Sequence, residues 1–259
     1  PVGELSDPQS ATIRVERGAE GDVLLQKDPR PHRLRVGLYS RRGGRLTRTD
    51  VVEADTSDAR TPLSGLGAAD LVLPNDGDLT YAKVRLDAAS VDAAEESLST
   101  LDDALARGLV LSALWNATRY GELAAARFLA IVRRHIGAET HSALRADVLA
   151  NASFAIGHYV AGADRARERS AWLETTWQGM LAADAGSDAQ LAWARALGAE
   201  ASYDDARAEE LKGMLAGTVA APDGLALDPE LRWEWLAALS ATGHATDADA
   251  DAELRRDPT

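Results

Sequence analysis

The sequence predicts a multidomain α and β protein: a small β-sandwich at residues 1–86, followed by an all-α, irregular HEAT-like helical array at residues 87–259. Two changes in composition near Leu86 indicate this. The first 86 residues hold 13 basic and 13 acidic side chains, so the net charge of −13 belongs entirely to the rest of the chain. Alanine, the strongest helix former, occurs 7 times before Asp87 and 44 times after it.

Short segments in which apolar and polar residues alternate predict the strands of the sandwich. They cover residues 11–17, 33–39, 45–52, 70–74 and 79–86. Ile13 and Val15 share one face of the first segment, and Leu34, Val36 and Leu38 share one face of the second. Gly43-Gly44 predicts a hairpin between the second and third segments. Asn75-Asp-Gly-Asp78 predicts a type I′ turn that pairs the last two segments.

Apolar residues at helical spacing predict the helices of the second part, near residues 101–118, 123–136, 144–156, 172–181 and 191–197. The residues expected to end helices are Gly137, Gly162, Gly186, Gly198, Gly217 and Gly243. The residues expected to begin helices as N-caps are Ser187, Asp228 and Thr246. Pairs of helices with short loops are typical of an α-solenoid, but the sequence shows no clean repeat period.

Composition excludes several classes of protein. No stretch approaches the roughly 20 apolar residues of a membrane span. The absence of cysteine excludes disulfides, cysteine-ligated zinc and a thiol nucleophile. The net charge of −13 argues against nucleic-acid binding, because phosphates would be repelled. The chain begins with Pro1 rather than Met, so we expect it to start inside a longer protein or to have been processed.

The sequence contains no recognisable set of catalytic residues. The five histidines include no H-E-x-x-H pattern, and no nucleophile elbow or phosphate-binding loop occurs. His135, Glu139 and His141 form the only cluster that suggests a metal. The two histidines are six positions apart, which places them on different faces of a helix, so polar residues at a helix end are the favoured interpretation.

Seven arginines between Arg30 and Arg48, with no acidic residue among them, form a basic segment. One interpretation is a solvated strand face. The other is that the segment contacts acidic residues elsewhere in the same protein.

Several segments resemble one family closely. They are Arg30–Tyr39, Gly44–Arg48, Asp70–Asp87, Leu114–Leu123, Gly186–Leu191, Asp223–Trp233 and Asp251–Thr259. Together they resemble the region after the catalytic domain in bacterial aminopeptidase N, a zinc metallopeptidase of the gluzincin type. The balance of 25 Arg to 3 Lys fits the variant found in high-GC bacteria. The motif residues that carry the resemblance are Asn75, Asp76, Asp78, Tyr81, Arg232 and Trp233.

The resemblance implies a non-catalytic C-terminal fragment of an enzyme that removes N-terminal residues from peptides. We expect the fragment alone to be inert, with no catalytic or metal-binding residues, and zinc to be the cofactor of the full-length enzyme only. The helical domain would cap the active-site chamber and control substrate access. The implied partners are the upstream catalytic domain of the same chain and peptide substrates, with no nucleic acid and no membrane, in the cytoplasm.

The resemblance also suggests details. Arg119 and Tyr120 are candidate substrate-binding residues, although Tyr120 replaces an expected acid. The family continues beyond a D-P-T sequence, so we expect a truncated helical domain in which the apolar helix at 231–239 is partly exposed. One alternative is an independent protein-interaction adaptor built from the sandwich and an α-solenoid. A remote third interpretation is a stand-alone hydrolase that uses His141 or His158.

Overall fold

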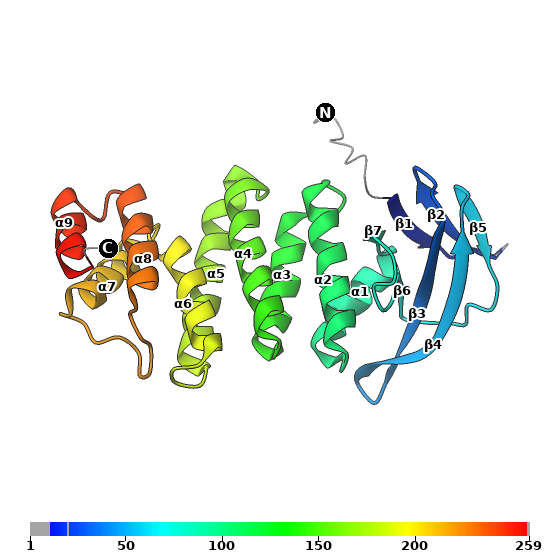
Figure 1. The fold of residues 1–259 in the computed structure, drawn as a ribbon, viewed down its shortest axis with the longest axis horizontal. Coiled ribbons are helices and arrows are strands. Elements are labelled where there is room, and N and C mark those ends of the chain that lie inside the picture. The colour runs from blue at the N-terminus through cyan, green and yellow to red at the C-terminus, as the bar shows by residue number, and fades with distance from the viewer. Residues whose placement is uncertain (1–10, 20, 258–259) are drawn as a thin grey trace. The chain divides into compact units, whose positions relative to one another are not determined.

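The structure, a computed structural model, describes residues 11–19 and 21–257 (Figure 1). The predicted fold class, a small β region followed by a helical domain, is confirmed. The chain forms two compact units that divide between Ala138 and Glu139, and each unit is described by itself below.

The change from strands to helices falls between Arg85 and Ala88, where the composition predicts it. The first three helices nevertheless belong to the same compact unit as the strands. The domain boundaries at 1–86 and 87–259 therefore stay a prediction.

The strands of the first unit form two sheets. They are β1 (Ala11–Glu16), β2 (Asp22–Lys27), β3 (His32–Arg42), β4 (Arg45–Thr56), β5 (Arg60–Leu63), β6 (Leu71–Pro74) and β7 (Ala82–Arg85). One sheet has the order β5-β2-β1-β7 and the other has the order β4-β3-β6. Strands β1 and β7 pair in parallel, and the other pairs are antiparallel.

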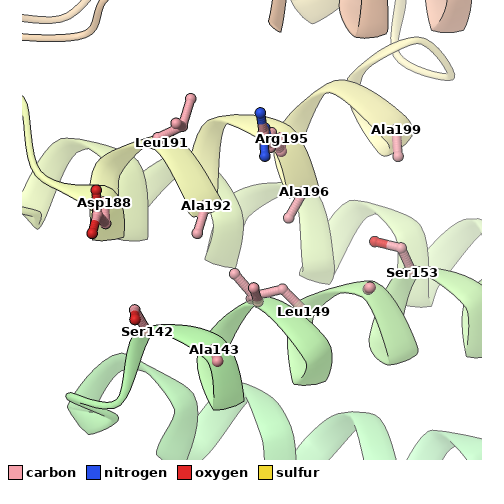
Figure 2. Close-up of a pocket in the computed structure, with 12 residues that line it drawn as sticks. Ser142, Ala143, Leu149, Ser153, Asp188, Leu191, Ala192, Arg195, Ala196 and Ala199 are labelled. Atoms are coloured by element: carbon pink, nitrogen blue, oxygen red, sulfur yellow. The ribbon is translucent and has the colours of Figure 1, made fainter. Parts of the chain in front are cut away.

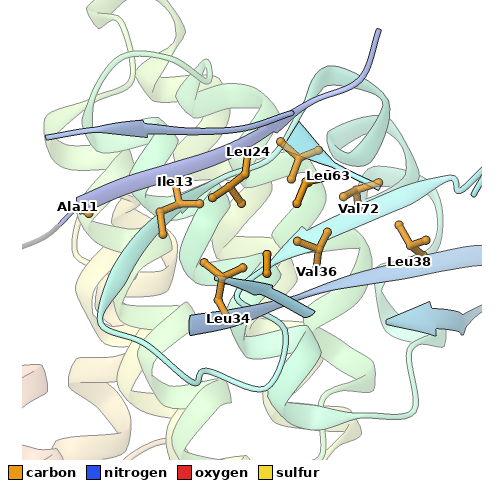
Figure 3. Close-up of a cluster of buried hydrophobic side chains, with 10 residues drawn as sticks. Ala11, Ile13, Leu24, Leu34, Val36, Leu38, Leu63 and Val72 are labelled. Carbon is orange, nitrogen blue, oxygen red and sulfur yellow. The ribbon is translucent and has the colours of Figure 1, made fainter. Parts of the chain in front are cut away.

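The core of the sandwich is built from apolar side chains of both sheets (Figure 3). Ile13 projects from one sheet and Leu34, Val36 and Leu38 project from the other, and all four are almost fully buried. The alternation in the sequence predicts these inward faces correctly, because successive side chains of a strand point to opposite sides.

The predicted pairing of 70–74 with 79–86 is wrong, although the hairpin of β3 and β4 around Gly43-Gly44 is confirmed. Strand β6 pairs with β3 in one sheet, while β7 pairs with β1 in the other. The chain between them crosses from sheet to sheet, so no type I′ hairpin turn forms there. The Asn75 side chain holds this crossover by hydrogen bonds to Thr80, a role that local sequence does not distinguish from a hairpin turn.

Strands β2 and β5 are absent from the sequence-based prediction. In β2 three apolar residues follow one another, so the alternation typical of a half-buried strand is missing. Strand β5 contains Pro62 and lies at the edge of its sheet, the position where proline is tolerated.

The described residues of the first unit also form the α-helices α1 (Ala88–Ser97), α2 (Ala104–Arg119) and α3 (Ala125–His135). Asp87 caps α1 by accepting a hydrogen bond from the Ser90 amide at 2.7 Å, and Asp103 caps α2 by accepting one from the Leu105 amide at 2.9 Å. Aspartate is a favoured N-cap because its carboxylate satisfies free amides of the first turn.

The basic segment 30–48 contacts acidic side chains of its own unit. Arg33 and Arg35 both pair with Glu53 on the neighbouring strand. Other arginines of the segment reach acidic residues of the helical region, in the pairs Arg41–Glu96, Arg45–Asp102 and Arg48–Asp103. The arginines of this segment therefore do meet acidic residues of the same protein, while Arg33, at 73% exposed, and Arg45, at 57% exposed, also fit a solvated strand face.

The second unit is helical. Its helices are α4 (Ser142–His158), α5 (Gly162–Ala182), α6 (Asp188–Ala201), α7 (Asp205–Ala216), α8 (Pro229–Ala241) and α9 (Asp247–Arg256). Helix α6 is central, because it packs against α4, α5, α7 and α8. The predicted N-caps are confirmed at Ser187, Asp228 and Thr246. A HEAT-like repeat stays a prediction.

Two glycines that we expect to end helices do not. Gly162 begins α5, and Gly198 lies inside α6. The reason at Gly198 is tertiary packing, because a Cβ atom there would lie 2.7 Å from the indole nitrogen of Trp235. Gly217 does end α7, in the left-handed conformation that glycine adopts without strain.

The expectation that the helix at 231–239 is partly exposed is wrong. Leu231, Trp235 and Leu239 on α8 are fully buried. Helix α8 packs against α6, α7 and α9, which cover its apolar face.

Candidate functional site

A groove of about 550 Å³ lies between α4 and α6 of the second unit. It exists because both helices present alanines at helical spacing, which are Ala143, Ala146 and Ala150 on α4 and Ala192, Ala196 and Ala199 on α6. Figure 2 shows Ala192 and Ala196 projecting from α6 toward α4, while Leu149 projects from α4 toward α6. Larger side chains at these positions would fill the space.

Polar groups flank the apolar part of the groove. Ser142 and Asp188 lie at the same end of the groove, where α4 and α6 begin (Figure 2). Ser153 lies at the opposite end, and its Oγ accepts a hydrogen bond from Trp172 Nε1 at 3.1 Å. An apolar groove with hydroxyl and carboxylate groups at its ends suits the binding of an extended peptide or of its side chains.

Arg195 also lines the groove and is held by two glutamates of α8. Its Nη2 lies 2.7 Å from Glu230 Oε2, and its Nε lies 3.5 Å from Glu234 Oε2. Burial raises the pKa of Glu234, while the charge of Arg195 opposes this change. The Arg195 guanidinium therefore already has acidic partners on α8, in a pair with Glu230 whose side chains are 38% and 70% exposed.

The two sequence-predicted binding residues lie in the first unit. Tyr120 Oη accepts a hydrogen bond from Lys83 Nζ at 2.7 Å, and the cations of Lys83 and Arg85 lie 5.2 and 4.9 Å from the centre of its ring. Arg85 pairs with Glu122, and Arg119 is exposed. Tyr120 is thus held by contacts with two cations. A role of Arg119 and Tyr120 in substrate binding stays a prediction.

The family motif residue Asp76 belongs to a buried network in the sandwich. Tyr39 Oη donates a hydrogen bond to Asp76 Oδ1 at 3.0 Å, and Arg48 Nη2 donates to the same oxygen at 2.8 Å. Burial, together with the negative charge of Asp76, raises the pKa of Tyr39. These contacts connect β3, β4 and the crossover loop, which is a structural role.

The motif residues Arg232 and Trp233 lie on α8. Arg232 forms a buried bidentate pair with Glu253 of α9, with N–O distances of 2.7 and 2.6 Å. Trp233 is half-buried and donates to Asp257 Oδ2 at 3.2 Å. Both residues therefore attach α9 to α8.

The histidines have partners within the fold. His135 Nδ1 lies 2.9 Å from Ser99 Oγ, and burial lowers the pKa of His135. His141 caps α4, and His158 Nδ1 lies 2.9 Å from the Phe154 carbonyl oxygen. Within residues 11–19 and 21–257, no group of three or more His, Cys, Asp or Glu side chains is arranged to hold a metal ion.

The groove between α4 and α6 was not predicted from the sequence. The sequence feature that accompanies the groove is alanine at positions three and four apart on two helices. This pattern does not identify a groove, because the same spacing of alanine also occurs where helices pack closely. No helix in the described part of the chain is both long enough and apolar enough to cross a membrane.

Three comparisons place the chain beside known proteins. The family model of the ERAP1-like C-terminal domain matches residues 71–259. Aminopeptidase N of Streptomyces lividans is 38% identical over 246 residues, which are 93% of this chain and 28% of the Streptomyces protein. The crystal structure of Legionella pneumophila aminopeptidase A in complex with aspartic acid matches 95% of this chain and 33% of its own, at 13% identity and a TM-score of 0.49.

Proposed function

The chain belongs to the ERAP1-like C-terminal domain family, and on this basis we propose that it is the non-catalytic C-terminal region of a zinc-dependent aminopeptidase N. The observation that carries the proposal is the 38% identity to Streptomyces lividans aminopeptidase N over 93% of the chain. Because the chain spans 28% of that relative, the removal of N-terminal residues from peptides is proposed for the whole enzyme. We place that enzyme in the cytoplasm, as the sequence resemblance implies.

Peptide hydrolysis would take place in a part of the enzyme outside this chain. In such an enzyme, a bound zinc ion would supply the polarisation of the peptide carbonyl and the activation of water. The described residues do not fit a zinc site, because they offer no suitable group of three ligands. We therefore assign no step of hydrolysis to this chain.

The role proposed for the helical region is to cap the active-site chamber and to control which peptides enter. Residues 139–259 contain 21 acidic and 10 basic side chains, an excess of 11 negative charges that favours protonated amino termini. The groove between α4 and α6 adds an apolar surface for the part of a peptide away from the scissile bond. Binding energy from such remote contacts lowers KM for long peptides.

Filling the groove tests this role. In the full-length enzyme, Ala146→Leu places a larger side chain in the groove at an exposed helical position, so folding is expected to be unaffected. We expect KM for a peptide of about ten residues to rise about tenfold, since a few methylene groups in a pocket change affinity by this order. KM for an aminoacyl-anilide is expected to stay the same, because this substrate is too short to use remote contacts.

The matched control is Ala237→Leu, which makes the same change at an exposed position of α8 outside the groove. It is expected to leave both KM values unchanged. Equal effects of Ala146→Leu on the long and the short substrate would contradict the proposed control of access.

The isolated chain is expected to be inert and to bind no stoichiometric zinc. Hydrolysis by this class of enzyme needs metal ligands and a general base in one cluster. The tests are an aminoacyl-anilide assay of the purified chain and elemental analysis after dialysis. Turnover that a chelator abolishes and zinc restores, at about one metal ion per chain, would show that a site has been missed.

A further inference from the structure

We propose that the loop at residues 77–81 of the sandwich is a docking point for the part of the aminopeptidase that precedes this chain, an inference that rests on the proposed function. Leu79 and Tyr81 are the docking side chains. The occupant is a surface of the preceding region with an apolar depression and a hydrogen-bond acceptor for the Tyr81 hydroxyl.

The loop is rigid because buried Asn75 holds it. The Asn75 side chain donates to the Thr80 carbonyl at 2.7 Å and accepts from the Thr80 amide at 3.1 Å. The Asp78 amide donates to the Asn75 carbonyl at 2.9 Å. Thr80 Oγ1 also lies 2.6 Å from His32 Nδ1 on β3. Asn75 itself is 1% exposed, so the loop is fixed from inside the sandwich.

This fixed loop holds two large apolar side chains in solvent. Leu79 is 52% exposed and Tyr81 is 76% exposed. Thr80 between them points its hydroxyl toward His32, so the hydrogen bonds that fix the loop leave its apolar side chains outside. A segment that is ordered before binding loses little entropy on association, which favours a docking role. Exposed apolar side chains grouped in one rigid loop are typical of an interaction surface.

Strand pairing indicates the occupant. Strand β7 begins at Ala82, directly after Tyr81, and pairs in parallel with β1, with Ala11 opposite Ala82. The first residue of β1 therefore lies beside the end of the docking loop. In the Streptomyces relative nearly three quarters of the length lies outside the matched region, and the matched family is a C-terminal domain. A preceding region is joined to the sandwich through β1, whose first residue, Ala11, lies opposite the residue that follows Tyr81.

Tyrosine nitration tests the proposal. Tetranitromethane is applied to the isolated chain and to the full-length enzyme, and peptide mapping by mass spectrometry measures the modification at each tyrosine. We expect Tyr81 to be nitrated in the isolated chain and at least tenfold less in the full-length enzyme. Tyr203, which is 57% exposed in the second unit, reports reagent access and is expected to react in both. Equal nitration of Tyr81 in the two proteins would overturn the proposal.

A double variant gives an independent measurement. Leu79→Ser with Tyr81→Ser is expected to leave the melting temperature of the isolated chain unchanged, because both side chains are exposed there. In the full-length enzyme it is expected to lower the melting temperature, since the docked side chains lose their apolar partner. An unchanged melting temperature in the full-length enzyme would overturn the docking role.

Two further measurements distinguish a failure of the docking proposal from a failure of the proposed aminopeptidase function. Concentration-dependent protection of Tyr81 in the isolated chain would assign the loop to contacts between copies of this chain, and would also overturn the proposal. Chelator-sensitive hydrolysis of an aminoacyl-anilide by the unmodified full-length enzyme tests the proposed function separately. The docking loop can therefore be rejected while the aminopeptidase assignment stands.

Discussion

Replacing Arg232 with methionine is expected to lower the free energy of unfolding by about 3–5 kcal/mol. Arg232 and Glu253 are each 7% exposed and form two parallel hydrogen bonds. Arg232 Nη2 also donates to the Leu215 carbonyl at 2.7 Å. Removing the guanidinium leaves the Glu253 carboxylate buried without its partner. Urea unfolding of the isolated chain, followed by circular dichroism, measures the loss.

Two further variants test this explanation. The double variant Arg232→Met with Glu253→Leu is expected to recover most of the lost stability, because no buried charge remains. Arg256→Met removes an exposed arginine whose Nε is 4.0 Å from the same carboxylate, and it is expected to change stability by less than about 0.5 kcal/mol. A loss below about 1 kcal/mol for Arg232→Met would contradict a dominant role of the buried pair.

The pair also predicts a dependence on pH. The hydrogen bonds from Arg232 lower the pKa of Glu253 below its ordinary value of 4.5. A carboxylate whose pKa is lowered by folding stabilises the protein fully above pH 4.5, and this contribution is lost as the pH falls through the lowered value. The difference in stability between the natural chain and Arg232→Met should therefore shrink below pH 4.5. A constant difference down to pH 3 would argue against ionic pairing.

Replacing Gly198 with alanine is expected to destabilise the second unit by about 1–3 kcal/mol. The new Cβ atom would lie 2.7 Å from the indole nitrogen of Trp235, which is fully buried. The indole cannot move away freely, because its nitrogen donates to the Ala194 carbonyl at 2.9 Å. The clash opposes the gain of about 1 kcal/mol that alanine normally brings to a helix. Thermal unfolding measures the net change.

Gly157→Ala is the matched control for Gly198→Ala. Gly157 also lies inside a helix, but no atom lies within 4 Å of the position its Cβ atom would take. This substitution is expected to raise stability by about 0.5–1 kcal/mol, because alanine restricts the unfolded chain. If both variants gain stability, the Trp235 indole leaves room for a Cβ atom at position 198, and the predicted clash is wrong.

Sequence patterns predict those features whose cause is local. The alternation at Ile13 and Val15 predicts an inward strand face, because strand geometry has a period of two residues. Asp228 followed by Pro229 predicts the start of α8, since both residues act on the first turn alone. The family motifs predict the relationship to aminopeptidase N, and the comparisons confirm it.

The candidate groove was not predictable in this way. Ala146 and Ala192 are ordinary helical alanines in the sequence, and the space between them depends on how far apart α4 and α6 lie. The same limit applies to Gly198, which resembles a helix stop until Trp235, 37 positions away in the chain, is placed against it.

Local patterns and family motifs were enough to predict the change from strands to helices near Leu86, the N-caps Ser187, Asp228 and Thr246, and the family of this protein, because each depends on neighbouring residues or on motif identity. The placement of β6 and β7 in different sheets could be learned only from the fold, as could the exposure of Leu79 and Tyr81 on the loop at residues 77–81. The physical reason is that sheet pairing, burial and groove width arise from contacts between residues far apart in the chain. Such contacts leave little trace in local propensity or periodicity.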